Sequence, residues 1–132
     1  MSYLIDTDII IYSLKDHPKV RQNFLERKNS IKTVSVITYG ELIFGAHKSS
    51  YKERNLATVR RIAELFPLIE LNSGILETFG ELKASEQKKG NTIEDFDLLI
   101  GSSALYLNYV LVTNNEKHFR TIPGLRIENW TK

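Results

Sequence analysis

The chain opens on an apolar run that leads directly into a carboxylate. Residues 3–5 (Tyr-Leu-Ile) are followed at once by Asp6, with no turn residue between them. A short apolar run of this kind predicts a strand that is buried on both faces, and such strands occupy the centre of parallel sheets. Asp6 then lies where the strand ends, and Thr7 and Asp8 are suited to cap a following helix. Ligands of open α/β sheets bind beyond the carboxyl ends of the strands, so Asp6 is either a capping residue or a ligand of a hard cation.

Strand-like and helix-like segments alternate along the rest of the chain. Further strands are expected at residues 32–36, 67–71, 109–113 and 125–130, the last at an edge of the sheet. Helices are expected at residues 9–13, 18–28, 38–47, 51–66, 73–89 and 92–107, with a short one after residue 115. This alternation predicts the α/β class, as a three-layer α/β/α sandwich with a central parallel sheet. The 132 residues fit a single domain, residues 1–132.

The amino-acid composition excludes several kinds of site and segment. The chain has no cysteine, which excludes disulfides, thiolate metal sites and cysteine nucleophiles. No segment approaches the ~18 consecutive apolar residues of a membrane helix, and no basic region precedes the first apolar run, so we expect no membrane contact, no signal peptide and a cytoplasmic location. The formal net charge of +2 permits a polyanionic partner without requiring one.

Four polar side chains are expected at the same rim of the sheet. Asp6 ends the first strand, Glu41 lies in the first turns of the helix after the second strand, Asp97 lies in the first turns of a later helix, and Asn115 follows the strand at residues 109–113. Carboxylates that converge on one spot repel each other unless a cation lies among them. Oxygen ligands of this type suit Mg²⁺ or Mn²⁺, and such an ion activates water against phosphate esters. The pattern therefore predicts metal-dependent phosphoester hydrolysis.

Asp95 is distinguished from Asp97 by helical geometry. Two residues apart, their side chains point about 200° apart on a helix and cannot both face one ion. Asp97 neighbours the apolar stripe of Phe96 and Ile100, which favours Asp97 as the inward residue. Asp95 is interpreted as the capping residue of a box that begins at Thr92.

Other residue types carry less information. The three histidines, His17, His47 and His118, have no spacing typical of metal ligands and are interpreted as surface residues. No Gly-rich phosphate loop is present. Trp130 is interpreted as a packing residue.

Four motifs in this order resemble the PIN domain, and most closely the VapC-type ribonuclease toxins of bacterial toxin–antitoxin pairs. The motifs are Leu-Ile-Asp-Thr-Asp-Ile around Asp6, Thr-Tyr-Gly-Glu-Leu around Glu41, Phe-Asp-Leu-Leu-Ile-Gly around Asp97, and Leu-Val-Thr-Asn-Asn-Glu-Lys-His-Phe followed by Ile-Pro-Gly-Leu. Each motif alone is weak, but together they extend over residues 3–130.

The resemblance implies a magnesium-dependent endoribonuclease of α/β/α fold that acts on RNA, forms a homodimer and is held inactive by a cognate antitoxin protein. Asp6 and Asp97 would be the principal metal ligands, with Glu41 as a further acidic ligand, direct or through water. Asn115 falls where many relatives carry a fourth acidic residue, and Asn114 is an alternative match for that position.

Three other functions fit parts of the sequence. A haloacid-dehalogenase-type phosphatase would use Asp6 as nucleophile and Asp8 as acid/base, but the chain is short for that fold and its cap. A phosphoryl-receiver module would need an acceptor aspartate after the third strand, where this chain has Glu70-Leu71-Asn72-Ser73. A binding module that retains the acids without catalysis is the third.

Overall fold

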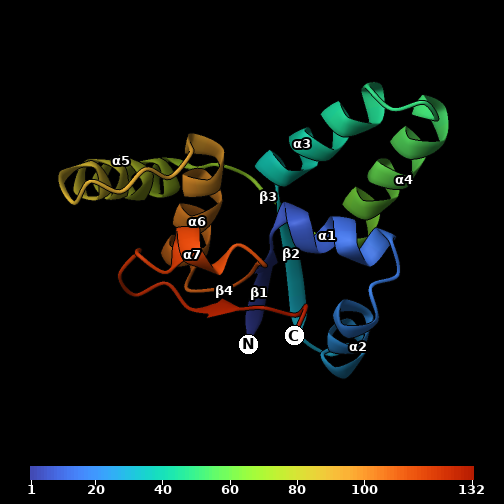
Figure 1. Cartoon of the computed structure of the whole chain (residues 1–132), viewed down its shortest axis with the longest axis horizontal. Coiled ribbons are helices and arrows are strands. Elements are labelled where there is room, and N and C mark those ends of the chain that lie inside the picture. Colours follow the sequence, from blue (N-terminus) through green and yellow to red (C-terminus); the bar gives the residue numbers. More distant parts are fainter.

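The computed structural model describes residues 1–132 and contains a five-stranded, wholly parallel sheet in the order β3-β2-β1-β4-β5, covered by helices on both faces (Figure 1). The strands are β1 (Ser2–Ile5), β2 (Ile31–Ser35), β3 (Leu68–Ile69), β4 (Val110–Val112) and β5 (Ile127–Glu128). The helices are α1 (Thr7–Leu14), α2 (Pro18–Glu26), α3 (Val36–His47), α4 (Lys52–Leu65), α5 (Ser73–Lys88), α6 (Asp95–Leu107) and α7 (Glu116–Phe119). The predicted α/β/α sandwich with a central parallel sheet is confirmed.

β1 shows how the sequence builds two cores. Successive side chains of a strand point to opposite faces of the sheet, and all three apolar residues of β1 are buried. Tyr3 and Ile5 join a core that also takes side chains from α1, α2, α3 and α4. Leu4 joins a second core that takes side chains from α5, α6 and α7. The unbroken apolar run is therefore explained by helices on both faces.

The site region follows from the strand order. β1 pairs with β2 on one side and with β4 on the other, with Leu4 opposite both Thr33 and Leu111. After β1 the chain builds the β2-β3 half of the sheet and then crosses β1 to build the β4-β5 half. The carboxyl ends of β1 and β4 therefore form the switch point of the sheet, where open α/β folds bind ligands.

Several element boundaries differ from the prediction. α3 begins at Val36 because the hydroxyl of Ser35 accepts the amide hydrogen of Ile37 at 3.0 Å and caps the helix. β3 is limited to two residues because the chain turns soon after Ile69 to reach Asn72, whose side chain caps α5. None of the helices combines the length and the apolar character that crossing a membrane requires.

Trp130 packs against Tyr3 and so joins a C-terminal segment to β1. Its ring is 2% exposed and meets the rings of Tyr3 and Phe24 edge-on, at centroid distances of 5.2 and 5.0 Å. The guanidinium of Arg27 lies 5.0 Å from the Trp130 ring and 3.5 Å from the carboxylate of Glu128. The predicted packing role of Trp130 is confirmed. The N-terminus lies at the amino end of β1, whereas Thr131 and Lys132 contact Asn114 and Glu116 beyond the carboxyl end of β4 (Figure 1).

α5 and α6 pack closely through a glycine. A Cβ atom placed on Gly74 would lie 2.3 Å from the ring of Tyr106 in α6. Gly80, further along α5, has nothing within 4 Å of the same position. Only the first of these two glycines is required by packing.

Candidate active site at the carboxyl ends of β1 and β4

Asp6 is the most buried acid at the switch point, with 5% of its surface exposed. Its side chain accepts hydrogen bonds from the amide of Thr7 and from the hydroxyl of Thr113, both at 2.8 Å. Burial, followed by the charge of Asp8, raises the pKa of Asp6 to about 7, although the two hydrogen bonds oppose the shift. Asp6 itself is the N-cap of α1, so the expectation that Thr7 or Asp8 would cap this helix is wrong.

Asp8 also lies at this rim, although the sequence favoured it as a helix cap and gave it a chemical role only in the phosphatase alternative. Oδ2 accepts the amide hydrogen of Asn114 at 3.1 Å, whereas Oδ1 is buried and has no hydrogen-bond partner. Burial is the main cause that raises the pKa of Asp8, and the charge of Asp97 adds to it. The signal that could have identified Asp8 is the Asp-x-Asp pattern directly after a buried strand.

Asp97 reaches the site from the first turn of α6. Burial raises its pKa, and His118 on α7 opposes that shift. The His118 Nδ1 atom lies 3.7 Å from Asp97 Oδ2 and 2.8 Å from the side-chain nitrogen of Asn115. His118 lies at the surface, as expected, and its ring in addition faces an acid of the site.

Asp95 lies outside the site. Its exposed carboxylate accepts a 2.9 Å ion pair from Lys83. The expected capping box is wrong, because α6 has Glu94 at its N-cap and no side chain caps it. Phe96 is 56% exposed, so it does not draw Asp97 inward; the buried neighbours Leu98 and Ile100 mark the inner face of α6.

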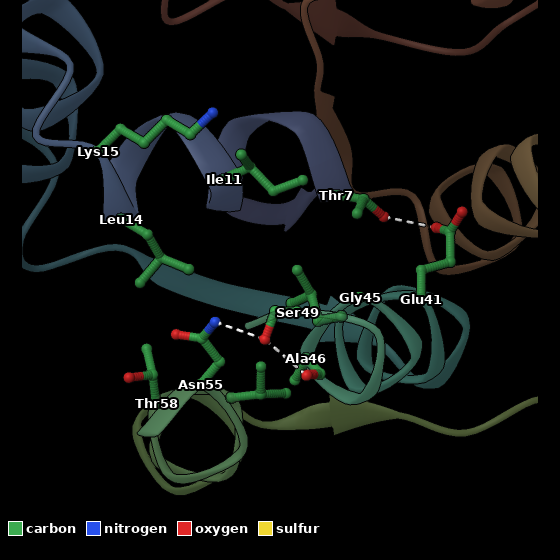
Figure 2. A pocket seen from close by; sticks show the side chains of 12 residues that line it. Thr7, Ile11, Leu14, Lys15, Glu41, Gly45, Ala46, Ser49, Asn55 and Thr58 are labelled. Carbon is green, nitrogen blue, oxygen red and sulfur yellow. Dashed lines mark hydrogen bonds between the residues drawn. The ribbon is translucent and has the colours of Figure 1, made fainter. Parts of the chain in front are cut away.

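Glu41 approaches from α3 and is linked to the site through one hydroxyl. Thr7 Oγ1 donates to Glu41 Oε1 at 2.7 Å (Figure 2). Thr7 Oγ1 also bonds to Thr38 Oγ1 at 2.9 Å. Thr7 follows Asp6 directly, so the carboxylate of Glu41 is held beside the N-terminus of α1. As the side chains stand, no three acid or histidine groups form a ready cluster for a metal ion.

Asn114 and Asn115 close the rim beyond β4. The amide of Asn115 donates to Thr113 Oγ1 at 2.9 Å, and its side chain contacts His118. The amide of Asn114 donates to Asp8, while its side-chain oxygen accepts hydrogen bonds from Asn129 and Thr131. The Asn115 side chain thus lies beside the histidine that faces Asp97, and the Asn114 side chain is turned toward the C-terminal residues.

The donor set suits a hard divalent cation. The charges of Asp8 and Asp97 raise the pKa of Asp6, and the charge of Asp97 raises the pKa of Asp8. The unpartnered Oδ1 atom of Asp8 is a buried acceptor without a donor, and such atoms in native structures commonly indicate a missing ligand. All the candidate ligands are oxygens, which Mg²⁺ and Mn²⁺ prefer.

A groove of about 540 Å³ begins at Thr7 and Glu41 and runs between α1 on one side and α3 and α4 on the other (Figure 2). We call it the α1–α3 groove. Ile11 and Leu14 of α1 contribute apolar surface and are 38% and 47% exposed. At its far end the side-chain amide of Asn55 donates a hydrogen bond to the hydroxyl of Ser49 at 2.8 Å.

Comparisons with known proteins agree with this geometry. The PIN domain model matches residues 3–125. Ribonuclease VapC2 of Rickettsia felis is 38% identical over the full length of both chains, and the tRNA(fMet)-specific endonuclease VapC of Shigella flexneri is 30% identical over 99% of both. Among solved structures, VapBC-1 from nontypeable Haemophilus influenzae superposes with a TM-score of 0.91 at 36% identity and covers 100% of both chains.

The match over nearly the whole chain, in sequence and in structure, leaves no room for a phosphatase or phosphoryl-receiver fold. This chain therefore belongs to the PIN-domain family and, within it, to the VapC ribonucleases of toxin–antitoxin pairs.

Proposed function

We propose that this chain is an endoribonuclease that cleaves RNA phosphodiester bonds with Mg²⁺ or Mn²⁺ held by Asp6, Asp97 and Glu41, and that Asp8 is a further ligand. The observation that carries the proposal is the buried, unpartnered Oδ1 atom of Asp8, an acid whose charge raises the pKa of Asp6 and whose own pKa is raised by the charge of Asp97. Family membership supplies independent support.

Each side chain has a definable task in this proposal. Thr113 and the amide of Thr7 fix the orientation of the Asp6 carboxylate, and the Thr7 hydroxyl holds Glu41 close by. When bound, the divalent ion neutralises the scissile phosphate and lowers the pKa of a water molecule. His118, held by Asn115, positions Asp97 at the rim.

The proposed substrate class is transfer RNA. The Shigella flexneri relative is named for cleavage of tRNA(fMet), and it matches this chain from end to end. The purified protein, freed of any inhibitor that co-purifies, should cut tRNA in the presence of Mg²⁺ or Mn²⁺ and should stop when EDTA is added. Undiminished cleavage in EDTA would exclude the metal mechanism.

We propose that a segment of the cognate antitoxin occupies the α1–α3 groove. Ile11 and Leu14 offer apolar contacts, and Glu41 at the catalytic end would attract a cationic side chain that takes over the charge of the metal. Expression of the chain alone should arrest growth, and co-expression of the neighbouring antitoxin gene should relieve it. The homodimer that the resemblance implies stays a prediction, to be tested by sedimentation of the isolated chain.

A further inference from the structure

A second groove, of about 420 Å³, lies beside the acidic site and has no apolar lining. It is bounded by the loop after β4, by α7 and by the C-terminal residues, and we call it the polar groove. Figure 1 places α7 next to α6 and β4, on the opposite side of the molecule from α4.

The polar groove is continuous with the acidic site through two residues. Asn114 lines the groove and donates its amide hydrogen to Asp8. Asn115 also lines it, and its amide bonds to Thr113, which in turn bonds to Asp6. A strand that leaves the acidic site along these two asparagines therefore enters the polar groove directly.

The charge of the polar groove is opposite in sign to that of the acidic site. Its side chains include three cations, Lys117, Arg120 and Lys132, and one carboxylate, Glu116, which leaves an excess of two positive charges. The acidic site repels a polyanion in the absence of metal. A neighbouring positive surface offsets that repulsion by binding phosphates on either side of the reacting one.

Glu116 contacts two of the basic side chains but engages only some of their N–H donors. It accepts hydrogen bonds from Lys132 and Asn129, both at 2.8 Å, and Arg120 lies 3.6 Å away. Arg120 and Lys132 are still 69% and 72% exposed. A guanidinium has five N–H donors and an ammonium has three, so both cations keep hydrogens that point to solvent.

We propose that the polar groove binds the backbone phosphates of the RNA strand next to the scissile bond, with Lys117, Arg120 and Lys132 as the contacting cations. The inference rests on the proposed ribonuclease function and adds the path of the substrate. Contacts of this kind position the strand and carry no sequence information.

The test measures binding separately from cleavage. Affinity for a tRNA transcript is measured in EDTA over a range of salt concentrations, for the wild-type chain and for Lys117→Gln/Arg120→Gln/Lys132→Gln. We expect the variant to bind at least about tenfold more weakly at low salt and its log–log salt slope to fall by about 2, since each single-strand phosphate contact contributes about 0.7. Melting curves verify that the variant is folded.

Two further variants distinguish binding by the polar groove from a general effect of the protein's net charge on RNA affinity. Lys52→Gln/Arg60→Gln/Arg61→Gln removes the same charge from α4, which packs on the other face of the sheet, and should bind tRNA almost as the wild type does. Lys117→Arg/Arg120→Lys/Lys132→Arg keeps the charge and should retain most of the affinity.

The outcomes distinguish this inference from the proposed function. If the wild type binds and cleaves tRNA but the polar-groove variant binds equally well, or the α4 variant loses as much affinity, the phosphate path is wrong and the ribonuclease stands. If the polar-groove variant loses only antitoxin binding, the surface serves a protein partner and the inference is overturned. A wild-type chain that neither binds nor cleaves tRNA overturns both.

Discussion

Thr113 donates a buried 2.8 Å hydrogen bond to Asp6 Oδ2, which joins the ends of the two central strands although 107 positions separate the residues. The bond fixes one carboxylate oxygen, and the amide of Thr7 fixes the other. Both hydrogen bonds favour the charged form of Asp6, yet burial outweighs them and raises its pKa to about 7. The metal-free Asp6 is therefore partly protonated at neutral pH, and a cation would displace that proton.

The stability of the metal-free protein should fall as the pH rises from about 4 to about 7. In this window the folded state keeps a proton on Asp6 that the unfolded chain, with an ordinary pKa of 3.8, has released. The pKa shift corresponds to a loss of at most about 4 kcal/mol in the free energy of unfolding over this pH range. Asp6→Asn keeps a capping side chain and removes the charge, so in EDTA it should melt several degrees above the wild type at pH 8. The difference should shrink toward zero below pH 4, and an equal difference at both pH values would contradict the assignment.

Asp97→Asn should reduce the rate of tRNA cleavage by more than about a hundredfold, because an amide replaces a candidate metal ligand. The matched control is Asp95→Asn in the same turn of α6, whose carboxylate makes only an exposed ion pair with Lys83. Such pairs contribute roughly 0–1 kcal/mol, so cleavage by this control should stay within about twofold of the wild type. Initial rates of tRNA cleavage at saturating Mn²⁺ are compared for the two variants and the wild type. If Asp95 proves essential and Asp97 dispensable, the placement of the site is wrong.

Asp8→Asn should weaken the binding of Mn²⁺ to the free protein by about tenfold. The amide oxygen can still accept the hydrogen bond from Asn114, but the oxygen that is now unpartnered becomes an NH₂ group that repels a cation. Calorimetric titration measures the affinity. Asp16→Asn, on an exposed turn with φ of 57°, removes the same charge away from the site and should leave the affinity unchanged. Equal affinity in all three proteins would exclude Asp8 as a ligand.

Gly74→Ala should destabilise the fold relative to Gly80→Ala by about 1–3 kcal/mol, since the new methyl group meets the ring of Tyr106. Gly80→Ala places its methyl group in open space and should raise stability by up to about 1 kcal/mol, because alanine favours the helix. Urea unfolding of both variants gives the comparison. Repeating Gly74→Ala in a Tyr106→Leu background should remove most of the penalty, and a penalty that persists there would place its cause elsewhere.

The sequence predicted the architecture well because the fold depends on signals that are local in the chain. Apolar runs such as residues 3–5 specify buried strands, Pro18 marks the start of α2, and Gly90 ends α5 with a φ of 77°. Leu76 shows the limit of periodicity: it continues the apolar stripe of α5 but is 47% exposed. A helical period shows which residues share a face, but not how much of that face the neighbouring elements cover.

The site was predicted less completely, because its contacts join distant segments. Asp6, Glu41 and Asp97 are proposed as site residues from their positions after strands and at the starts of helices. Two contacts depend on how α3 and α7 pack against their neighbours, which no local pattern encodes. These are the hydrogen bond from Thr7 to Glu41 and the approach of His118 to Asp97. Asp8 is expected to cap α1, but Asp6, two residues earlier, takes that role, and the Asp8 side chain accepts a hydrogen bond from Asn114 instead.

The central position of β1 has a consequence for synthesis. β1 can pair with β2 soon after both are synthesised, but its other neighbour, β4, and the residue that orients Asp6, Thr113, come much later in the chain, Thr113 by 107 positions. Domains fold as their segments emerge from the ribosome, so a chain of this topology stays without an assembled site until β4 and Thr113 have emerged. Truncated chains that end before residue 113 lack the hydrogen bond that orients Asp6.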